Sequence, residues 1–191
     1  GRELSVNKVY NEFKSRQISV SRNTLSDLLE YYEDAYLLFS VPEFTRSLAN
    51  NTRSASKVYA VDPAMFGAFS PASALDHGQR LETAVFNALR RRTPAVRPGS
   101  VCRLLIKDKN KSHEVDFVAG DALLMQAYSL IQVSVDMTSE KTREREIAAL
   151  DAAMAQFDLG ESVIVTMDEQ ADIPCKHGVV HAVPAWKWLL S

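Results

Sequence analysis

The chain has 191 residues, of which 46% are hydrophobic and 24% charged, and its formal net charge is −2. This length and composition are those of a globular protein of one or two domains that needs no disulfide or metal to hold its core. The slightly negative charge excludes a protein that attracts nucleic acid over its whole surface, so any contact with DNA must come from a local basic patch. The two cysteines stand far apart, which is typical of a reducing compartment.

The sequence carries no sign of a membrane or nucleotide-binding protein. No apolar run is long enough to cross a bilayer and no signal peptide is present, so we expect a cytoplasmic protein with no membrane partner. No glycine-rich phosphate-binding loop occurs, so this chain is expected to bind no ATP itself. The first residue is glycine rather than methionine, and we expect the chain to be part of a longer protein.

Residues 1–62 have the pattern of a winged-helix-like segment. Ser5 and Ser21 are predicted to cap two helices, each with apolar side chains at helical spacing. Two predicted strands follow, at 36–41 and 57–61, and they flank a polar segment that contains arginines. Two helices followed by a β-hairpin with a basic tip are typical of a winged helix.

Residues 63–78 contain prolines and glycines and are predicted to be a linker. Residues 79–191 alternate between helical and strand periods and predict a second domain, a mixed α/β fold with helices on the faces of a mixed sheet. Its elements are expected to be a helix at 79–92, strands at 101–106, 114–119, 122–127 and 130–135, a helix that Thr138 caps and Gly160 ends, strands at 161–167 and 179–183, and a closing helical turn at 184–190.

Two neighbouring strands of this sheet carry polar side chains at every second position, so these side chains are expected to share one face. The first strand has Glu114 and Asp116, and the second has Gln132 and Ser134. A metal-dependent nuclease would hold a carboxylate on the first strand and an acid and a lysine on the second. The pattern therefore predicts a nuclease-type scaffold that lacks part of its catalytic charge.

Six short motifs, spread in order over nearly the whole chain, resemble one family. They are the run 24–30, the strand end 41–44, Lys57-x-Tyr59-x-x-Asp62, Gly78-x-x-x-Glu82-x-x-Val85-Phe86, Glu114-Val115-Asp116-Phe117 and Pro184-Ala185-Trp186. Together they resemble the uncharacterised domain that lies C-terminal to the ATPase module in many bacterial and archaeal AAA-type ATPases. The resemblance implies a winged-helix-like segment, then a domain similar to the PD-(D/E)XK nucleases at 79–191, with ATP bound only by an ATPase module upstream of this chain.

In a nuclease of this type, one acid on a helix and two carboxyl positions on strands hold Mg²⁺, and a lysine stabilises charge. The resemblance places Glu82 as the helix acid and Asp116 as the central metal ligand. Gln132 and Ser134 stand where the second acid and the lysine are expected. The amide oxygen of Gln132 can bind Mg²⁺ but adds no charge, and a serine cannot replace a lysine. We therefore expect Glu82, Asp116 and Gln132 to bind Mg²⁺ weakly if at all, and no catalytic residue is assigned.

A lysine from elsewhere in the chain could fill this gap. Lys107, Lys109 and Lys111 precede the strand of Asp116, and Lys141 follows Ser134. The simpler interpretation is that these lysines lie on solvated loops, so we expect no hydrolytic activity.

Contact with DNA would need local basic patches. The candidate DNA-binding residues are Arg22 on the second predicted helix, Arg46 and Arg53 on the predicted wing, and Arg90, Arg91 and Arg92 at the end of the helix at 79–92. Basic side chains at a helix C-terminus also compensate the helix dipole, which needs no DNA. The second helix is acidic beyond Arg22, which disfavours close approach of its C-terminal half to phosphate.

The sequence is compatible with three functions. The favoured one is a non-catalytic C-terminal accessory domain of an AAA-type ATPase, which binds DNA or a protein partner and keeps a degenerate nuclease-like site. The second is a Mg²⁺-dependent DNA nuclease with a relocated lysine. The third is a protein-interaction module, in the form of a homo-oligomer or a docking domain.

Overall fold

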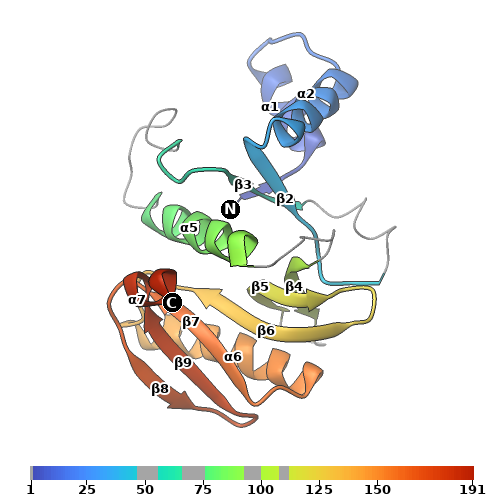
Figure 1. Ribbon diagram of the computed structural model, residues 1–191. Helices are drawn as coiled ribbons and strands as arrows, with labels where there is room; N and C mark the ends of the chain where they lie inside the picture. Colours follow the sequence, from blue (N-terminus) through green and yellow to red (C-terminus); the bar gives the residue numbers. More distant parts are fainter. Residues whose placement is uncertain (1, 47–55, 66–75, 93–99, 108–111) are drawn as a thin grey trace.

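The computed structural model describes residues 2–46, 56–65, 76–92, 100–107 and 112–191, which form two β-sheets with helices around them (Figure 1). The smaller sheet is antiparallel with strand order β1–β3–β2, and the larger sheet is mixed with order β4–β5–β6–β7–β9–β8. The strands are β1 (Arg2–Leu4), β2 (Leu38–Val41), β3 (Ser56–Ala60), β4 (Val101–Lys107), β5 (Ser112–Asp121), β6 (Gln126–Val133), β7 (Glu161–Thr166), β8 (Ala171–Pro174) and β9 (Val179–Pro184). The helices are α1 (Val6–Ser15), α2 (Arg22–Asp34), α5 (Asp76–Arg92), α6 (Glu140–Phe157) and α7 (Ala185–Leu190). The predicted mixed α/β class is confirmed.

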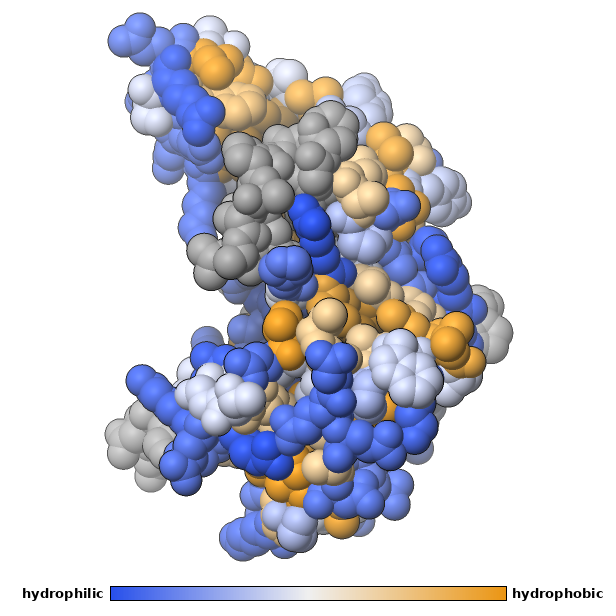
Figure 2. Space-filling view, turned by 90° about the vertical axis from the view of Figure 1, so that its left-hand side faces the viewer, coloured by the Kyte–Doolittle hydropathy of each residue, from blue (hydrophilic) through white to orange (hydrophobic). Residues whose placement is uncertain are grey.

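The two N-terminal helices stand away from the larger sheet, at the top of Figure 1. Ser21 caps α2 as predicted, because its hydroxyl oxygen accepts the main-chain N–H of Thr24 over 3.0 Å. Helix α2 buries only Leu25, and it leaves Leu28 and Tyr31 exposed. In Figure 2, hydrophobic surface shows between hydrophilic residues over this end of the molecule. No helix in the described ranges is long and apolar enough to span a bilayer.

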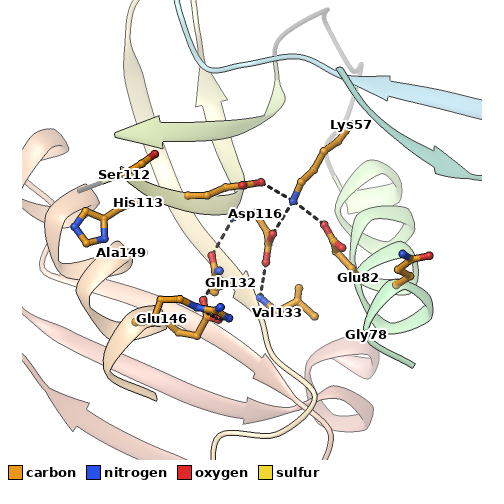
Figure 3. A pocket seen from close by; sticks show the side chains of 13 residues that line it. Lys57, Gly78, Glu82, Ser112, His113, Asp116, Gln132, Val133, Glu146 and Ala149 are labelled. Atoms are coloured by element: carbon orange, nitrogen blue, oxygen red, sulfur yellow. Dashed lines mark hydrogen bonds and ion pairs between the residues drawn. The ribbon is translucent and has the colours of Figure 1, made fainter. Parts of the chain in front are cut away.

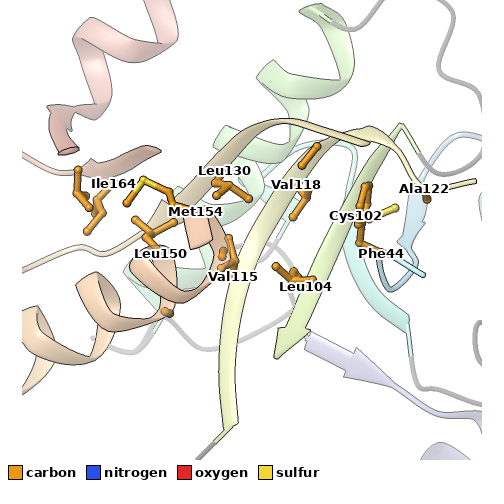
Figure 4. Close-up of a cluster of buried hydrophobic side chains, with 14 of the residues drawn as sticks. Phe44, Cys102, Leu104, Val115, Val118, Ala122, Leu130, Leu150, Met154 and Ile164 are labelled. Atoms are coloured by element: carbon orange, nitrogen blue, oxygen red, sulfur yellow. The ribbon is translucent and has the colours of Figure 1, made fainter. Parts of the chain in front are cut away.

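The larger sheet is covered on both faces. Strands β4, β5 and β6 form an antiparallel meander, and β6, β7 and β9 run parallel. Helix α6 makes the crossover from β6 to β7, which a parallel pair requires. Helix α6 packs on a core that contains Val115, Leu130 and Ile164 (Figure 4). Helices α5 and α7 cover the other face, against Phe117 and Ile131.

A β-bulge interrupts β5 at the position of Asp116. Cys102 pairs with Val118 and Leu104 with Val115, so β5 has one residue more than β4 between these pairs. Strict alternation would place Val115 and Phe117 on one face, yet they belong to different cores. The extra residue therefore re-aims the strand around Asp116, as bulges next to functional sites do.

An aromatic cluster joins the smaller sheet to the larger one. The ring of Tyr59 on β3 stacks on Phe86 of α5 with 4.6 Å between centroids, and it lies 5.4 Å from Phe117 of β5. Tyr59 and Phe117 are fully buried, and Phe86 is nearly so. Burial of such large aromatic surfaces is a major source of stability, and it fixes β3 beside α5 and β5.

A seam of hydrogen bonds joins the two sheets a second time. The main-chain N–H of Arg103 donates to the Pro42 carbonyl over 2.9 Å, and the N–H of Phe44 donates to the Arg103 carbonyl over 2.7 Å. The Arg103 side chain, 2% exposed, pairs with Glu3 of β1 over 2.6 Å. The stretches 1–62 and 79–191, which we predict as separate domains, thus share both a core and main-chain hydrogen bonds.

The strand predicted at 122–127 is wrong. Residues 122–125 form the turn between β5 and β6, and only the last two predicted positions are extended. The carboxylate of Asp121 accepts the N–H of Leu124 over 3.0 Å, and Met125 has a φ of 54°. This turn chemistry overrides the strand preference of the apolar run.

Both predicted ends of the long helix are displaced. The N–H and hydroxyl of Thr138 bond to the Asp136 carboxylate, so Thr138 stays outside α6 and Ser139 precedes the first helical residue. Asp158, with a φ of 54°, ends the helix before Gly160 is reached. Aspartate tolerates this left-handed conformation better than most residues with a side chain.

Other elements also differ from the expectations. The short edge strands β1 and β8 carry no alternating pattern that would reveal them. Helix α5 begins at Asp76, so the last residues of the predicted linker 63–78 are helical. The middle of that linker, 66–75, lies outside the described residues, as does most of the predicted wing at 47–55.

The position of the core can be tested with one substitution made at two sites of the same hairpin. Leu130 is fully buried, whereas Leu123 is 66% exposed. We expect Leu130→Ala to lower the free energy of unfolding by about 2–5 kcal/mol, and Leu123→Ala to change it by less than about 0.5 kcal/mol. Urea unfolding followed by circular dichroism measures both, and equal losses would contradict the fold.

Candidate active site

A cleft of about 510 Å³ opens where β3, α5, β5, β6 and α6 meet (Figure 3). Its polar lining comes from every one of these elements, and includes Lys57, Gln79, Glu82, Glu114, Asp116, Gln132, Arg145 and Glu146. A concave site with convergent titratable groups is the usual place for binding or catalysis.

The ammonium of Lys57 lies between three carboxylates. Its Nζ is 2.7 Å from Glu114 Oε1, 2.9 Å from Asp116 Oδ1 and 3.1 Å from Glu82 Oε1. Burial alone would lower the pKa of Lys57, but the carboxylates of Asp116 and Glu82 outweigh it and hold this pKa above its ordinary range. Lys57 is therefore a permanent positive charge at the centre of the cleft.

Tyr59, two residues along β3, holds the helix acid. The side chains of Lys57 and Tyr59 share one face of the strand. The Tyr59 hydroxyl donates to Glu82 Oε1 over 2.8 Å. Burial and the neighbouring Glu82 carboxylate raise the pKa of Tyr59, so this hydroxyl stays a donor. Burial acts to raise the pKa of Glu82, while Lys57 and Tyr59 act against it, and the pKa is lowered overall. Lys57 and Tyr59 thus both contact Glu82 as a carboxylate.

Asp116 is a buried acid of the cleft with a partner at each carboxylate oxygen. Its Oδ1 receives Lys57, and its Oδ2 accepts the main-chain N–H of Val133 on β6 over 3.1 Å. Burial and the charge of Glu82 raise the pKa of Asp116 to about 6, although Lys57 and the Val133 hydrogen bond act in the opposite direction. One ammonium is not enough to hold this carboxyl group in its ordinary range.

Gln132 joins the acid cluster to α6. Its Oε1 accepts the main-chain N–H of Asp116 over 3.0 Å, and its Nε2 donates to Glu146 Oε2 over 2.6 Å. Arg145 donates to the other oxygen of Glu146. Ser134 turns aside and donates to the Asp136 carbonyl over 3.1 Å.

The described lining carries more negative than positive charge. Four of its residues are acidic, namely Glu82, Glu114, Asp116 and Glu146, whereas Lys57 and Arg145 are the cations. Carboxylate and amide oxygens are ligands that Mg²⁺ accepts, and a divalent cation would offset the excess charge. The carboxylates converge on the Lys57 ammonium, and within the described ranges no three His, Cys, Asp or Glu side chains are grouped so that they could hold a metal as they stand. The donor chemistry therefore fits Mg²⁺, provided that Lys57 shares its carboxylates.

The structure brings the three predicted site residues, Glu82, Asp116 and Gln132, into one cleft. The expectation that a lysine is missing is wrong, because Lys57 contacts two of them. Lys107 and Lys141 do not line this cleft, and Lys109 and Lys111 lie outside the described residues. The spacing of Lys57 and Tyr59 on one strand face was the available signal, but their distance from Asp116 along the chain concealed it.

The predicted DNA-binding arginines that the structure describes contact several different elements. Arg22 lies over the Tyr10 ring at 4.1 Å, Arg90 over Phe39 at 4.1 Å and Arg92 over Trp188 at 4.2 Å. Arg46 donates to the Leu124 carbonyl over 3.2 Å at the β5–β6 turn, and Arg91 is exposed at the end of α5. Arg53 lies outside the described residues. Four of these side chains thus have partners within the protein.

Comparison with known proteins gives relatives without an assigned function. Residues 1–76 match a family model described as "Domain of unknown function (DUF8612)". The chain is 33% identical over 195 aligned positions to "Uncharacterized protein MJ1544" of Methanocaldococcus jannaschii, and the match covers 99% of this chain but 41% of the relative. The chain thus spans about two fifths of the length of this curated relative. No solved structure matches this chain.

Removal of the Lys57 charge would leave three carboxylates without their shared partner. We expect Lys57→Met to lower the free energy of unfolding by about 3–5 kcal/mol, because breaking a buried ion pair leaves uncompensated charge. Lys141→Met, at an exposed position, is the matched control and should change stability by less than about 0.5 kcal/mol. Equal effects in urea unfolding would show that Lys57 is solvated.

The raised pKa of Asp116 makes stability depend on pH. Its folded value of about 6 lies above an unfolded value of about 3.9, so protons bind the folded state more tightly. The stability that this adds is fully present below about pH 4 and is lost as pH rises through about 6, a change of about 3 kcal/mol. The variant Asp116→Asn has no titrating side chain at this position. From pH 4 to 7 the free energy of unfolding of the unaltered chain should therefore fall by this amount relative to that of the variant. Parallel stability profiles of the two proteins would contradict the raised pKa.

Proposed function

We propose that the cleft is the active site of a divalent-metal-dependent nuclease related to the PD-(D/E)XK type, in which Lys57 replaces the missing strand lysine. The observation that carries this proposal is the Lys57 ammonium, 2.9 Å from Asp116 and 3.1 Å from Glu82. A lysine beside a central strand carboxylate and a helix acid is the charge set that the resemblance to these nucleases implies, and a metal held by such acids can assist phosphodiester cleavage.

The order of elements supports the same proposal. From α5 onward the chain runs helix, three-stranded meander, crossover helix and parallel strand, in the spatial order β4–β5–β6–β7. The resemblance named for residues 79–191 implies this arrangement, with its acids on the first helix and the second strand. Glu82 on α5 and Asp116 on β5 occupy those elements.

Each residue of the cleft has a role in this proposal. Glu82 and Asp116, with the amide oxygen of Gln132, would hold Mg²⁺, which when bound polarises the phosphate and lowers the pKa of a water molecule. Lys57 donates hydrogen bonds to the phosphate oxygens as negative charge grows there. Tyr59 keeps Glu82 turned into the cleft, because its hydroxyl donates to that carboxylate over 2.8 Å.

A second candidate is the non-catalytic accessory domain of an AAA-type ATPase. The observation that favours it is that polar groups of the cleft already have hydrogen-bond partners within the protein. Both oxygens of Asp116 and both ends of the Gln132 amide are paired in this way. In that case Lys57 takes the place of the metal and the cluster serves stability. The exposed Leu28 and Tyr31 of α2 then favour a protein partner or a second copy of the chain over DNA.

The N-terminal unit and the wider context also belong to these proposals. The order β1–α1–α2–β2–β3 with the sheet order β1–β3–β2 supports a winged-helix-like unit at 1–62. An upstream ATPase module that binds ATP and a cytoplasmic location remain parts of the proposal. The greater length of the Methanocaldococcus relative leaves room for such a module.

The nuclease proposal is tested by cleavage of supercoiled plasmid, linear duplex and single-stranded DNA with Mg²⁺ or Mn²⁺. We expect metal-dependent cleavage that Asp116→Asn and Lys57→Met each reduce by about a hundredfold or more, because each removes charge that the transition state needs.

Asp121→Asn at the far end of β5 and Lys141→Met are the matched controls, and both should cleave as the unaltered chain does. Cleavage that chelators leave intact, or that survives in Asp116→Asn, would refute the proposal. If no substrate is cleaved while the variants remain folded, the accessory-domain candidate takes its place.

A further inference from the structure

Gln132 and Glu146 form a buried pair at the inner wall of the cleft. Gln132 on β6 is 6% exposed and Glu146 on α6 is 5% exposed. The Gln132 Nε2 donates to Glu146 Oε2 over 2.6 Å, and the Gln132 Oε1 accepts the Asp116 N–H over 3.0 Å. The pair therefore links α6, through β6, to the main chain that carries Asp116.

The partners on either side fix the orientation of the Gln132 amide. An ionised carboxylate only accepts hydrogen bonds and a main-chain N–H only donates them. An amide at position 132 satisfies both when its nitrogen faces Glu146 and its oxygen faces Asp116. A glutamate at 132 would bring two carboxylates together across the 2.6 Å now spanned by a hydrogen bond, and like charges at that distance cannot both remain ionised.

Arg145 supplies the charge that Glu146 needs at this depth. Its guanidinium donates from Nε to Glu146 Oε1 over 3.1 Å and from Nη2 to the same oxygen. The Arg145 side chain is 72% exposed, so it lies at the mouth of the cleft while Glu146 lies inside. A guanidinium is charged at every physiological pH, and the buried carboxylate is therefore always paired.

We infer that Gln132 and Glu146 act as one unit of the cleft, in which β6 supplies the amide and α6 supplies the negative charge. Glu146 is a positioning residue, which holds the amide oxygen of Gln132 toward Asp116 and keeps negative charge at the wall of the cation site. The glutamine at 132 and the glutamate at 146 are then complementary, and their roles can be exchanged. This inference rests on the proposed function, since it assigns the acids of the same cleft.

A charge-exchange experiment tests the pairing without any measurement of activity. Gln132→Glu should raise the unfolding equilibrium constant about tenfold or more, in favour of the unfolded chain, because it opposes two buried carboxylates. Glu146→Gln in the same chain should restore it, because the carboxylate on β6 then accepts both from the Asp116 N–H and from the amide on α6. If Glu146→Gln instead adds its own loss to that of Gln132→Glu, the pairing is refuted.

Binding of Mn²⁺, followed by electron paramagnetic resonance of the free ion at pH 7.5, tests the role toward the cation. Glu146→Gln alone should weaken binding about tenfold or more, and the exchanged double variant should recover it. Glu144→Gln, the same change at an exposed position of α6, is the control and should bind as the unaltered chain does. Unchanged affinity in Glu146→Gln would refute the role of Glu146.

The two experiments separate the inference from the function on which it rests. Absence of Mn²⁺ binding in every variant, the unaltered chain included, would overturn the nuclease proposal and with it the role toward the cation. Rescue of stability by the exchange would in that case still establish Glu146 as the partner that determines the glutamine at 132. Binding of Mn²⁺ without rescue would retain the nuclease proposal and refute the pairing.

Discussion

The ion pairs of the Lys57 ammonium join the smaller sheet to helix α5 and to the larger sheet. The ammonium comes from β3 of the smaller sheet and meets Glu82 of α5 and Glu114 and Asp116 of β5, all within 3.1 Å. Without that charge the carboxylates would repel one another in a poorly solvated cleft. Any movement of the smaller sheet relative to the larger one therefore changes the electrostatics of the cleft directly.

Aromatic packing positions the Lys57 ammonium in the cleft, and the main-chain geometry of β5 positions Asp116 beside it. The stack of Tyr59 on Phe86 and Phe117 holds β3 against the larger sheet, and Lys57, two residues from Tyr59 on the same strand face, enters the cleft. The bulge in β5 puts Phe117, directly after Asp116, into a different core from Val115. The network continues through Gln132 to Glu146, so the acids are supported from α6 as well as from β3. Such support from several elements is what holds reacting groups in fixed geometry.

Local pattern predicted most helices and strands of the larger sheet, since their apolar spacing is regular and strong. It also led to Asp116 and Gln132 as residues of one site, to which the resemblance added Glu82. It missed Lys57 and Glu146, because both reach the cleft through contacts between residues far apart in the sequence. Lys57 and Asp116, for example, are separated by 59 positions. It missed the bulge because a one-residue change of register leaves no trace in hydrophobicity. A lysine that the pattern of one strand does not supply can thus reach the cleft from another strand.

The most direct test of the account is the protonation and mobility of the Lys57 side chain. Nitrogen-15 nuclear magnetic resonance of the lysine ammonium groups, assigned with Lys57→Arg, measures both. The account predicts one ammonium signal that exchanges slowly with water and remains protonated well above the ordinary lysine pKa of about 10.4. A Lys57 signal that exchanges as fast as those of exposed lysines and titrates near that value would contradict it.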